Sequence, residues 1–418
     1  MISLRSMPVR AILSIVVAFA LLAVACAAAA EKPRRKRASA AAKSEKQPAE
    51  LLAKVRVLGG GPAPFALDAR SALLVDARTG AVLYAYDEHE KMQPASLAKI
   101  MTFYLALDAL EDGKLAKDTK VTISEAAWRL SMDDSVSRMF LPVGSQVSVD
   151  ELLYGLMVSS GNDAAVALAE HLGGTSDAFA RRMNDKARAL GLKSTNFTNP
   201  DGLPTENEYT TAADMVHLGV ELLRRHPEAL IWTSTKEYTF HNIQQRNFNT
   251  LLFYDSRVNG IKTGHVKEAG FHVVVSAEAD GMQLVGAVMG TPNMERRRLE
   301  AKKLLDWAFG AYATAKPDWR GAVPAKMSVY GGVADEVAIA PARAPYITVE
   351  RGQESKLTLA YAPKSRYLVA PVAKGAVVGE LAIARASKTV ATIPVKTSAA
   401  IAQGGFLKRM HDRVRRMF

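Results

Sequence analysis

Apolar and polar residues follow different periods in separate stretches of the chain. From Ser71 to Tyr86, SALLVDARTGAVLYAY alternates on both sides of a turn at Gly80, which predicts a β-hairpin. After Pro94, apolar residues recur three and four positions apart through SLAKIMTFYLALDAL. This spacing predicts a buried helix that begins near Ser96.

Further helices and strands follow along the chain. The stretch SVDE at Ser148 has a capping-box pattern ahead of LLYGLMV, and the helical run DAFARRMNDKARAL stops at Gly191. Two strands surround the Asp280-Gly281 turn in GFHVVVSAEADGMQLVGAVMG, and a last helix covers ERRRLEAKKLLDWAFGAY. This order predicts a mixed α/β (α+β) domain over residues 65–315, an antiparallel sheet flanked by helices.

The pattern changes beyond about Ala315. Short β-type runs such as YITVE, KLTLAYA and VGELAIA alternate with Pro and Gly turns, which predicts a small all-β domain over residues 318–397. In residues 404–418, bulky apolar side chains fall on one side of a helical projection and five Lys/Arg side chains on the other. We interpret this end as an amphipathic helix that lies on a membrane surface, in preference to a helix that packs on the β domain.

Residues 1–30 have the layout of a secretory signal peptide. Two arginines and no acid precede an apolar run from Ala11 to Ala25, and small residues lead to a predicted cleavage after Ala30. An uncleaved signal anchor and lipidation of Cys26 stay open as alternatives. Because Cys26 is the only cysteine, cleavage after Ala30 would leave neither a disulfide nor a thiol nucleophile.

The net charge of +12 lies mostly outside the predicted domains. Residues 31–50 and residues 404–418 each carry +4, and residues 51–403 carry only +2. Basic ends of this kind suit anionic lipid or wall polymer better than a nucleic-acid groove, so no nucleic-acid partner is expected. Residues 31–64, rich in Ala, Lys, Arg, Pro and Gly, are interpreted as a flexible basic linker.

The helix that begins near Ser96 carries a candidate nucleophile and its base. Lys99 lies one helical turn after Ser96 on the same face, so its amine can reach the serine hydroxyl. A lysine can act as this base only when burial or a nearby positive charge keeps it neutral. The helix start also places backbone N–H groups where an oxyanion would form. Ser96 is the only serine in the chain three residues before a lysine.

Two further polar stretches stand in otherwise apolar surroundings. SSGNDAA places Ser160 and Asn162 in a break between helical runs, where a polar loop is expected to line a site. GIKTG places Lys262 beside Thr263 on a strand, where Gly264 would permit close approach of another backbone. Lys262 would supply the positive charge that keeps the first lysine neutral. The sequence has no HExxH, CxxC, GxSxG or phosphate-loop motif, so we expect no metal and no cofactor.

The order Ser-x-x-Lys, Ser-x-Asn and Lys-Thr-Gly resembles the penicillin-binding protein and serine β-lactamase superfamily. PASLAKIMT, SSGNDAAVALAE and GIKTGHVKEAGF, with DARSALLVDARTGAVLY ahead of them, resemble the low-molecular-weight D-alanyl-D-alanine carboxypeptidases. That family's layout of export signal, catalytic domain, small β domain and amphipathic anchor matches most of the chain. The basic segment 31–50 is not part of the family pattern.

The resemblance implies a role for each matching residue. Ser96 would attack the carbonyl between two D-alanines of a peptidoglycan stem peptide with Lys99 as base, and water would hydrolyse the acyl-enzyme. β-Lactams would acylate the same serine. Ser160 and Lys262 would return a proton to the leaving amine. The substrate-binding groups would be Asn162, Thr263, Gly264, the backbone N–H groups of Ser96 and His265 as the oxyanion hole, and Arg297 on the terminal carboxylate.

Three alternatives share part of this pattern. A serine β-lactamase has the same motifs, but class A enzymes use a glutamate that acts on water. Between the second and third motifs, NPDGLPTENEYTTAADM contains Glu206 and Glu208 without a Glu-x-x-Leu-Asn pattern. A D,D-endopeptidase of this fold usually lacks the β domain, and a silent wall-binding protein would have lost Ser96 or Lys99. We predict a carboxypeptidase on the periplasmic face of the bacterial cytoplasmic membrane.

Overall fold

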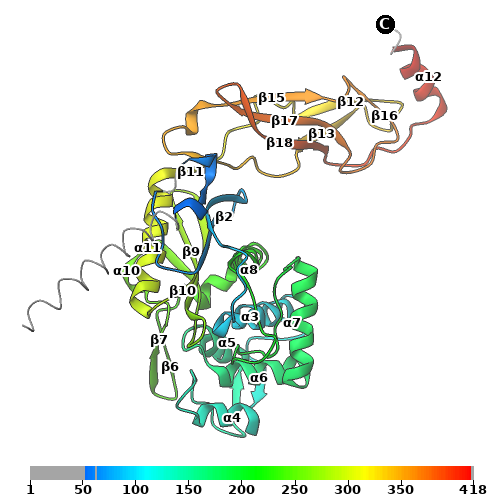
Figure 1. Cartoon of the computed structure of the whole chain (residues 1–418). Coiled ribbons are helices and arrows are strands. Elements are labelled where there is room, and N and C mark those ends of the chain that lie inside the picture. Colours follow the sequence, from blue (N-terminus) through cyan, green and yellow to red (C-terminus); the bar gives the residue numbers. More distant parts are fainter. Residues whose placement is uncertain (1–51, 62–63, 416–418) are drawn as a thin grey trace, which may run out of the picture. The chain divides into compact units, whose positions relative to one another are not determined.

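The structure is a computed structural model that describes residues 52–61 and 64–415 (Figure 1). The predicted signal peptide, the basic segment 31–50 and the last three residues of the predicted amphipathic helix lie outside the described residues. Every candidate site residue belongs to the second of two compact units, which are residues 1–56 with 60–67 and residues 57–59 with 68–418.

A central sheet with the order β1-β3-β2-β10-β9-β8 organises the α/β region. The four pairs from β3 to β8 are antiparallel, and both predicted hairpins are present, β2 with β3 and β9 with β10. The edge strand β8 carries the Lys-Thr-Gly motif. The strands are β1 (Arg56–Val57), β2 (Ser71–Asp76), β3 (Ala81–Tyr86), β8 (Val258–Val266), β9 (Gly270–Ala279) and β10 (Met282–Thr291).

Helices flank this sheet, with α11 on one side and α8 among the helices on the other (Figure 1). The predicted capping box at Ser148 and the helix stop at Gly191 are confirmed. The helices are α3 (Lys99–Glu111), α4 (Glu125–Met132), α5 (Val149–Met157), α6 (Asn162–Gly173), α7 (Ser176–Leu190), α8 (Ala212–Arg225), α9 (Leu230–Thr233), α10 (Leu251–Tyr254) and α11 (Met294–Ala311).

Helix α3 is buried almost all round, as the apolar sequence after Pro94 predicts. Ten of its thirteen residues are buried, which is the pattern of a helix inside a core and not on a surface. Phe103 packs edge-on against Trp232 of α9, with ring centroids 5.7 Å apart. Burial of an aromatic side chain of this size contributes about 2 kcal/mol to the stability of the fold. The packing of α3 therefore holds the residues at its start in place.

Two small two-stranded sheets stand outside the central sheet in the α/β region. They pair β4 with β5 and β6 with β7, each antiparallel. The hairpin β6–β7 follows α9, and the loop after it leads through α10 to the edge strand β8. The bounds are β4 (Lys120–Thr122), β5 (Gln146–Ser148), β6 (Glu237–Phe240) and β7 (Ile243–Arg246).

The C-terminal region is all β up to one final helix, α12 (Phe406–Arg415). Its six-stranded sheet has the order β15-β17-β18-β13-β12-β16, and β11 pairs separately with β14. Alternate residues of β17 and β18, such as Leu381, Ile383, Ile393 and Val395, are fully buried. Among the described residues, none of the helices combines the length and apolar character needed to cross a bilayer. The strands are β11 (Tyr312–Ala315), β12 (Lys326–Tyr330), β13 (Glu336–Pro341), β14 (Ile347–Glu350), β15 (Leu357–Pro363), β16 (Leu368–Val369), β17 (Val377–Arg385) and β18 (Lys388–Thr397).

Candidate active site

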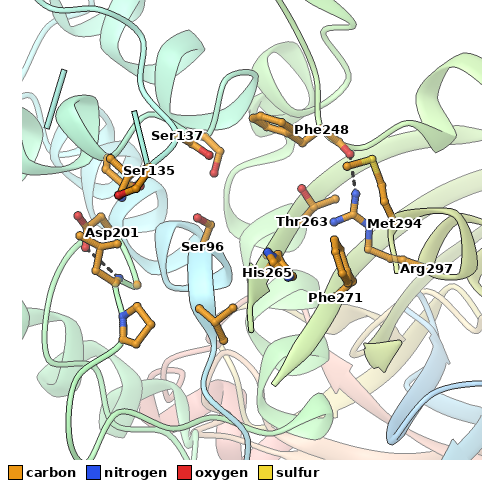
Figure 2. Close-up of a pocket in the computed structure, with 18 residues that line it drawn as sticks. Ser96, Ser135, Ser137, Asp201, Phe248, Thr263, His265, Phe271, Met294 and Arg297 are labelled. Atoms are coloured by element: carbon orange, nitrogen blue, oxygen red, sulfur yellow. Dashed lines mark hydrogen bonds between the residues drawn. The ribbon is translucent and has the colours of Figure 1, made fainter. Parts of the chain in front are cut away.

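A cavity of about 240 Å³ lies where the three polar motifs meet. Figure 2 shows Ser96 between Asp201 on one side and Thr263 and Arg297 on the other. The structure therefore brings together residues that are up to 201 positions apart in the sequence. The predicted site residues that line the cavity are Ser96, Ser160, Asn162, Thr263, Gly264, His265 and Arg297. Lys99 and Lys262 are buried behind them.

Ser96 lies on a short 3-10 turn, η2 (Ala95–Ala98), and the α-helix begins only at Lys99. The predicted helix that begins near Ser96 is present, with a 3-10 first turn and α-helical geometry from Lys99 on, and the Ser-x-x-Lys pair meets. The backbone at Ala95 has φ 51°, a conformation that non-glycine residues rarely adopt. Such local strain is typical of functional sites, where the surrounding structure holds it.

Two glycines allow other segments to pass directly against this turn. A Cβ at Gly264 of β8 would lie 3.0 Å from Pro94 O and 3.3 Å from Leu97 N, so the predicted close approach at this glycine is present. A Cβ at Gly202 would lie 1.9 Å from Ala95 O, which no side chain could tolerate. The turn is thus held between β8 and the loop that contains Gly202.

The Lys99 amine makes three hydrogen bonds. Its Nζ lies 2.9 Å from Ser96 Oγ, 2.6 Å from Asn162 Oδ1 and 2.5 Å from Asp201 O. The amide and carbonyl oxygens can only accept, so they take two N–H groups of the amine. A neutral amine would then direct its lone pair at the Ser96 hydroxyl, which is the geometry that a base needs.

Burial sets the pKa values of both lysines in the site. It lowers the pKa of Lys99 to about 8, against the weaker opposing effects of the nearby carboxylates, Asp201 first. Burial, and then the charges of Lys99 and Arg297, lower the pKa of Lys262 well below its usual range. Of the two expected causes, burial and a nearby positive charge, burial is the larger one for Lys99.

Lys262 and Ser160 form a second amine–hydroxyl pair. Lys262 Nζ lies 2.8 Å from Ser160 Oγ and donates to Thr263 O at 3.1 Å. Ser160 has φ 56° in the turn ahead of α6, so the break that SSGNDAA predicts between helices is present. Asn162 is the first residue of α6, and its N–H donates to Ser137 O at 2.8 Å. This turn therefore fixes Ser160 and Asn162 together.

Arg297 provides a positive charge at the other end of the cavity. Its guanidinium donates to Phe248 O at 2.9 Å and lies over the Phe271 ring, 5.9 Å from the centroid (Figure 2). Burial lowers its pKa to about 10, so it remains charged at neutral pH. Among the described residues, no acid forms an ion pair with Arg297. Its charge is available to a carboxylate in the cavity, beside the Thr263 hydroxyl.

Sequence reasoning missed Asp201 and Asp163. Asp201 gives its carbonyl to Lys99 and lines the cavity, and the turn sequence Asn-Pro-Asp-Gly was the only local signal for it. The Asp163 carboxylate is fully buried and accepts from Ser131 Oγ at 2.7 Å and Met139 N at 3.0 Å. It thereby ties the loop that carries Ser137 to α6. Neither contact could be found from spacing, because each joins distant segments.

Comparison with known proteins shows the family of this chain. The sequence pattern of the D-alanyl-D-alanine carboxypeptidase family matches residues 60–293. This chain belongs to that family. The pattern of the C-terminal domain of penicillin-binding protein 5 matches residues 312–403, the all-β region. The family resemblance and the fold class predicted from the sequence are both confirmed.

Individual carboxypeptidases are similar over most of the chain. The D-alanyl-D-alanine carboxypeptidase DacA of Haemophilus influenzae is 38% identical over 84% of this chain and 90% of its own length. The DacA of Escherichia coli K12 is 37% identical over 84% of this chain and 88% of its own. The crystal structure of penicillin-binding protein 5 from Haemophilus influenzae superposes with a TM-score of 0.75 at 38% identity, over 82% of this chain and 100% of that one.

Proposed function

We propose that this carboxypeptidase removes the terminal D-alanine from peptidoglycan stem pentapeptides through an acyl-enzyme on Ser96. The observation that carries the proposal is the position of the Lys99 amine, 2.9 Å from Ser96 Oγ. Its other two hydrogen bonds go to the amide oxygen of Asn162 and the carbonyl oxygen of Asp201, which can only accept. A buried amine with a pKa near 8 is neutral in a useful fraction of molecules at neutral pH. It can therefore accept the serine proton.

Acylation begins when Ser96 Oγ attacks the carbonyl of the penultimate D-alanine and its proton passes to Lys99. The backbone N–H groups of Ser96 and His265 hold the oxyanion, and a single donor of this kind contributes about 3 kcal/mol. The C–N bond then breaks, and the proton that Lys99 took from Ser96 passes to the leaving amine through the Ser160 hydroxyl, which is bonded to Lys262. The Lys262 amine, whose pKa is lowered by burial, holds the Ser160 hydroxyl in place for this transfer.

The ends of the cavity orient the substrate. The unpaired charge of Arg297 and the Thr263 hydroxyl receive the terminal carboxylate of the peptide. Asn162 bonds Lys99 through Oδ1, so its amide N–H₂ is left to hold the carbonyl of the preceding residue. The match to the D-alanyl-D-alanine carboxypeptidase family favours carboxypeptidase over endopeptidase activity.

β-Lactams are proposed as covalent inhibitors of the same serine. Solved structures of penicillin-binding protein D2 from Listeria monocytogenes hold ampicillin or cefotaxime, with TM-scores of 0.53 and 0.54 to this chain at 29% and 30% identity. Those structures cover 59% and 60% of this chain and 100% of the Listeria chain. A β-lactam carboxylate would take the place of the substrate carboxylate at Thr263.

Export and membrane attachment complete the proposal. In α12, the polar edge meets the β region: Asp412 is 2% exposed and accepts from Gly331 N at 2.8 Å. The apolar side chains of α12 face away from this contact and are more than half exposed, which supports binding at a membrane surface. They are Phe406, Leu407, Met410 and Val414. We therefore place the enzyme at the periplasmic face of the cytoplasmic membrane.

The test is D-alanine release from a peptide ending in D-Ala-D-Ala, with mass spectrometry of the protein after penicillin treatment. Wild type should release D-alanine and carry one penicillin on Ser96, and Ser96→Ala should do neither. A penicillin adduct without D-alanine release would favour endopeptidase activity. Rapid penicillin turnover without a lasting adduct would mean that the protein is a β-lactamase.

A further inference from the structure

Asp201 is an acidic residue in the cavity wall. Its carbonyl binds Lys99, but its carboxylate has no part in the acylation steps. Asp201 is 3% exposed and lines the same cavity as Ser96, on the side of Ser96 opposite Thr263 (Figure 2). Its Oδ1 accepts from Leu203 N at 3.2 Å, and Asn199 Oδ1 accepts from Gly202 N at 2.6 Å. These turn bonds, and the contact of Gly202 with Ala95, fix the carboxylate relative to the nucleophile.

The Asp201 carboxylate has no cation paired with it among the described residues. Lys99 acts on it only from a distance: the Lys99 amine bonds the Asp201 carbonyl and not the carboxylate. Burial raises the pKa of Asp201, and the Lys99 charge opposes this rise only in part. A buried acid without a paired cation is uncommon away from functional sites, and desolvation makes its carboxylate a stronger base.

Other acids of the region are excluded by their contacts. Asp163 is occupied by the Ser131 hydroxyl and by backbone N–H groups. Glu206 is exposed, and Glu208 is buried without lining the cavity. Among the described residues that line the cavity, Asp201 is the only acid. It is therefore the acid that is available to a water molecule in this cavity.

We propose that Asp201 is the base that activates water for hydrolysis of the acyl-enzyme, an inference that rests on the proposed acyl-enzyme at Ser96. The carboxylate takes one proton from water while the water oxygen bonds to the acyl carbonyl carbon. The bond between that carbon and Ser96 Oγ then breaks. The proton held by Asp201 passes through a water molecule to the neutral Lys99 amine, which gives a proton to Oγ and restores the serine hydroxyl. The product leaves as a carboxylic acid that ionises in water.

This assignment divides the two half-reactions between two bases. The Lys99 amine has its N–H groups on Asn162 and on the Asp201 carbonyl, so its lone pair is directed at Ser96 Oγ. That geometry suits removal and return of the serine proton. An attacking water approaches the acyl carbon and not Oγ, so it needs an acceptor elsewhere on the wall, which the Asp201 carboxylate provides.

The test compares Asp201→Asn with wild type in the full-length mature protein. Asparagine keeps an Oδ1 to accept from Leu203 N but cannot take a proton, so the loop is preserved and the base is lost. With penicillin, the acylation rate constant should change less than about 3-fold, and adduct loss should slow by about 100-fold. With a D-Ala-D-Ala peptide, one rapid equivalent of D-alanine should precede a slow steady state.

The matched control is Glu206→Gln, an exposed acid in the same loop, which should acylate and deacylate as wild type does. If Asp201→Asn lost its adduct at the wild-type rate, the role of Asp201 would be wrong, and the proposed acyl-enzyme at Ser96 would stand. An equal fall of acylation and deacylation would also overturn it, because it would indicate a general loss of site structure. Absence of any Ser96 adduct in wild type would overturn the proposed function and this inference with it.

Discussion

Lysines in two regions of the molecule show how one side chain serves opposite purposes. In the cavity, Lys99 and Lys262 are fully buried and their hydrogen bonds go to hydroxyl, amide and carbonyl groups. At α12, Lys408 is partly exposed and forms ion pairs with Asp335 and Asp412. Desolvation lowers the first two pKa values, and hydrogen bonds to carboxylates raise the third.

The partners, and not the residue type, decide what each lysine can do. A buried amine without a carboxylate bonded to it loses its proton easily and becomes a base. An amine bonded to carboxylates stays protonated, so it can form ion pairs but cannot act as a base. The cavity is therefore built for proton transfer, and the α12 end for electrostatic attachment to the β region. Matched substitutions in these two regions separate proton transfer from attachment.

The largest effect is expected from Lys99→Arg. A guanidinium stays protonated at any working pH, so it cannot accept the Ser96 proton, and penicillin acylation should fall by about 1,000-fold. Lys408→Arg, the same change at α12, should leave acylation within about 2-fold because arginine can keep both ion pairs. Lys99→Gln, which adds no buried charge, should be as slow as Lys99→Arg in stopped-flow acylation. A fast Lys99→Gln enzyme would contradict the base assignment.

A smaller loss is expected from Ser160→Ala. Removal of the hydroxyl bonded to Lys262 takes away the route by which the leaving amine receives its proton, so D-alanine release should fall by about 100-fold. The control is Ser159→Ala. Among the described residues this adjacent hydroxyl, just beyond the end of α5, donates to Gly155 O at 2.8 Å and not to a group of the proton route. If both variants lost activity equally, local packing and not proton transfer would explain the effect.

The smallest effect on catalysis is expected at α12. Met410→Glu places a charge on the exposed apolar side, so binding to vesicles that contain anionic lipid should weaken by about 10-fold in a flotation assay. D-Alanine release from a soluble peptide should not change. Val390→Glu replaces an exposed apolar residue of β18 outside α12 and should bind vesicles as wild type does. Equal losses in the two variants would argue against α12 as the attachment surface.

Local features of the fold could be predicted from the sequence. The hairpins, the capping box at Ser148 and the stop at Gly191 depend on neighbours within a few residues, and the structure confirms all of them. The all-β region could be predicted for the same reason. The 3-10 geometry of the turn at Ser96 could not, because contacts of β8 and of Gly202 with the turn hold Ser96 outside the α-helix.

Site residues that are held by long-range contacts could not be predicted from the sequence. Asp201 reaches Lys99 across 102 positions, and no periodicity encodes that approach. The main cause of the lowered Lys99 pKa could not be chosen from the sequence, which allowed both burial and a nearby positive charge. The depth of burial, which only the folded chain defines, is the larger effect.

The most direct test of the account is a titration of the Lys99 amine. The protein would be labelled with ¹⁵N at lysine side chains, and the Lys99→Gln variant would identify the signal by its loss. We predict that Lys99 loses its proton near pH 8 and that the acylation rate rises about tenfold per pH unit below this value, reaching a plateau above it. A Lys99 signal that stays protonated up to the ordinary value of 10.5 would contradict the central claim that burial makes this lysine a base.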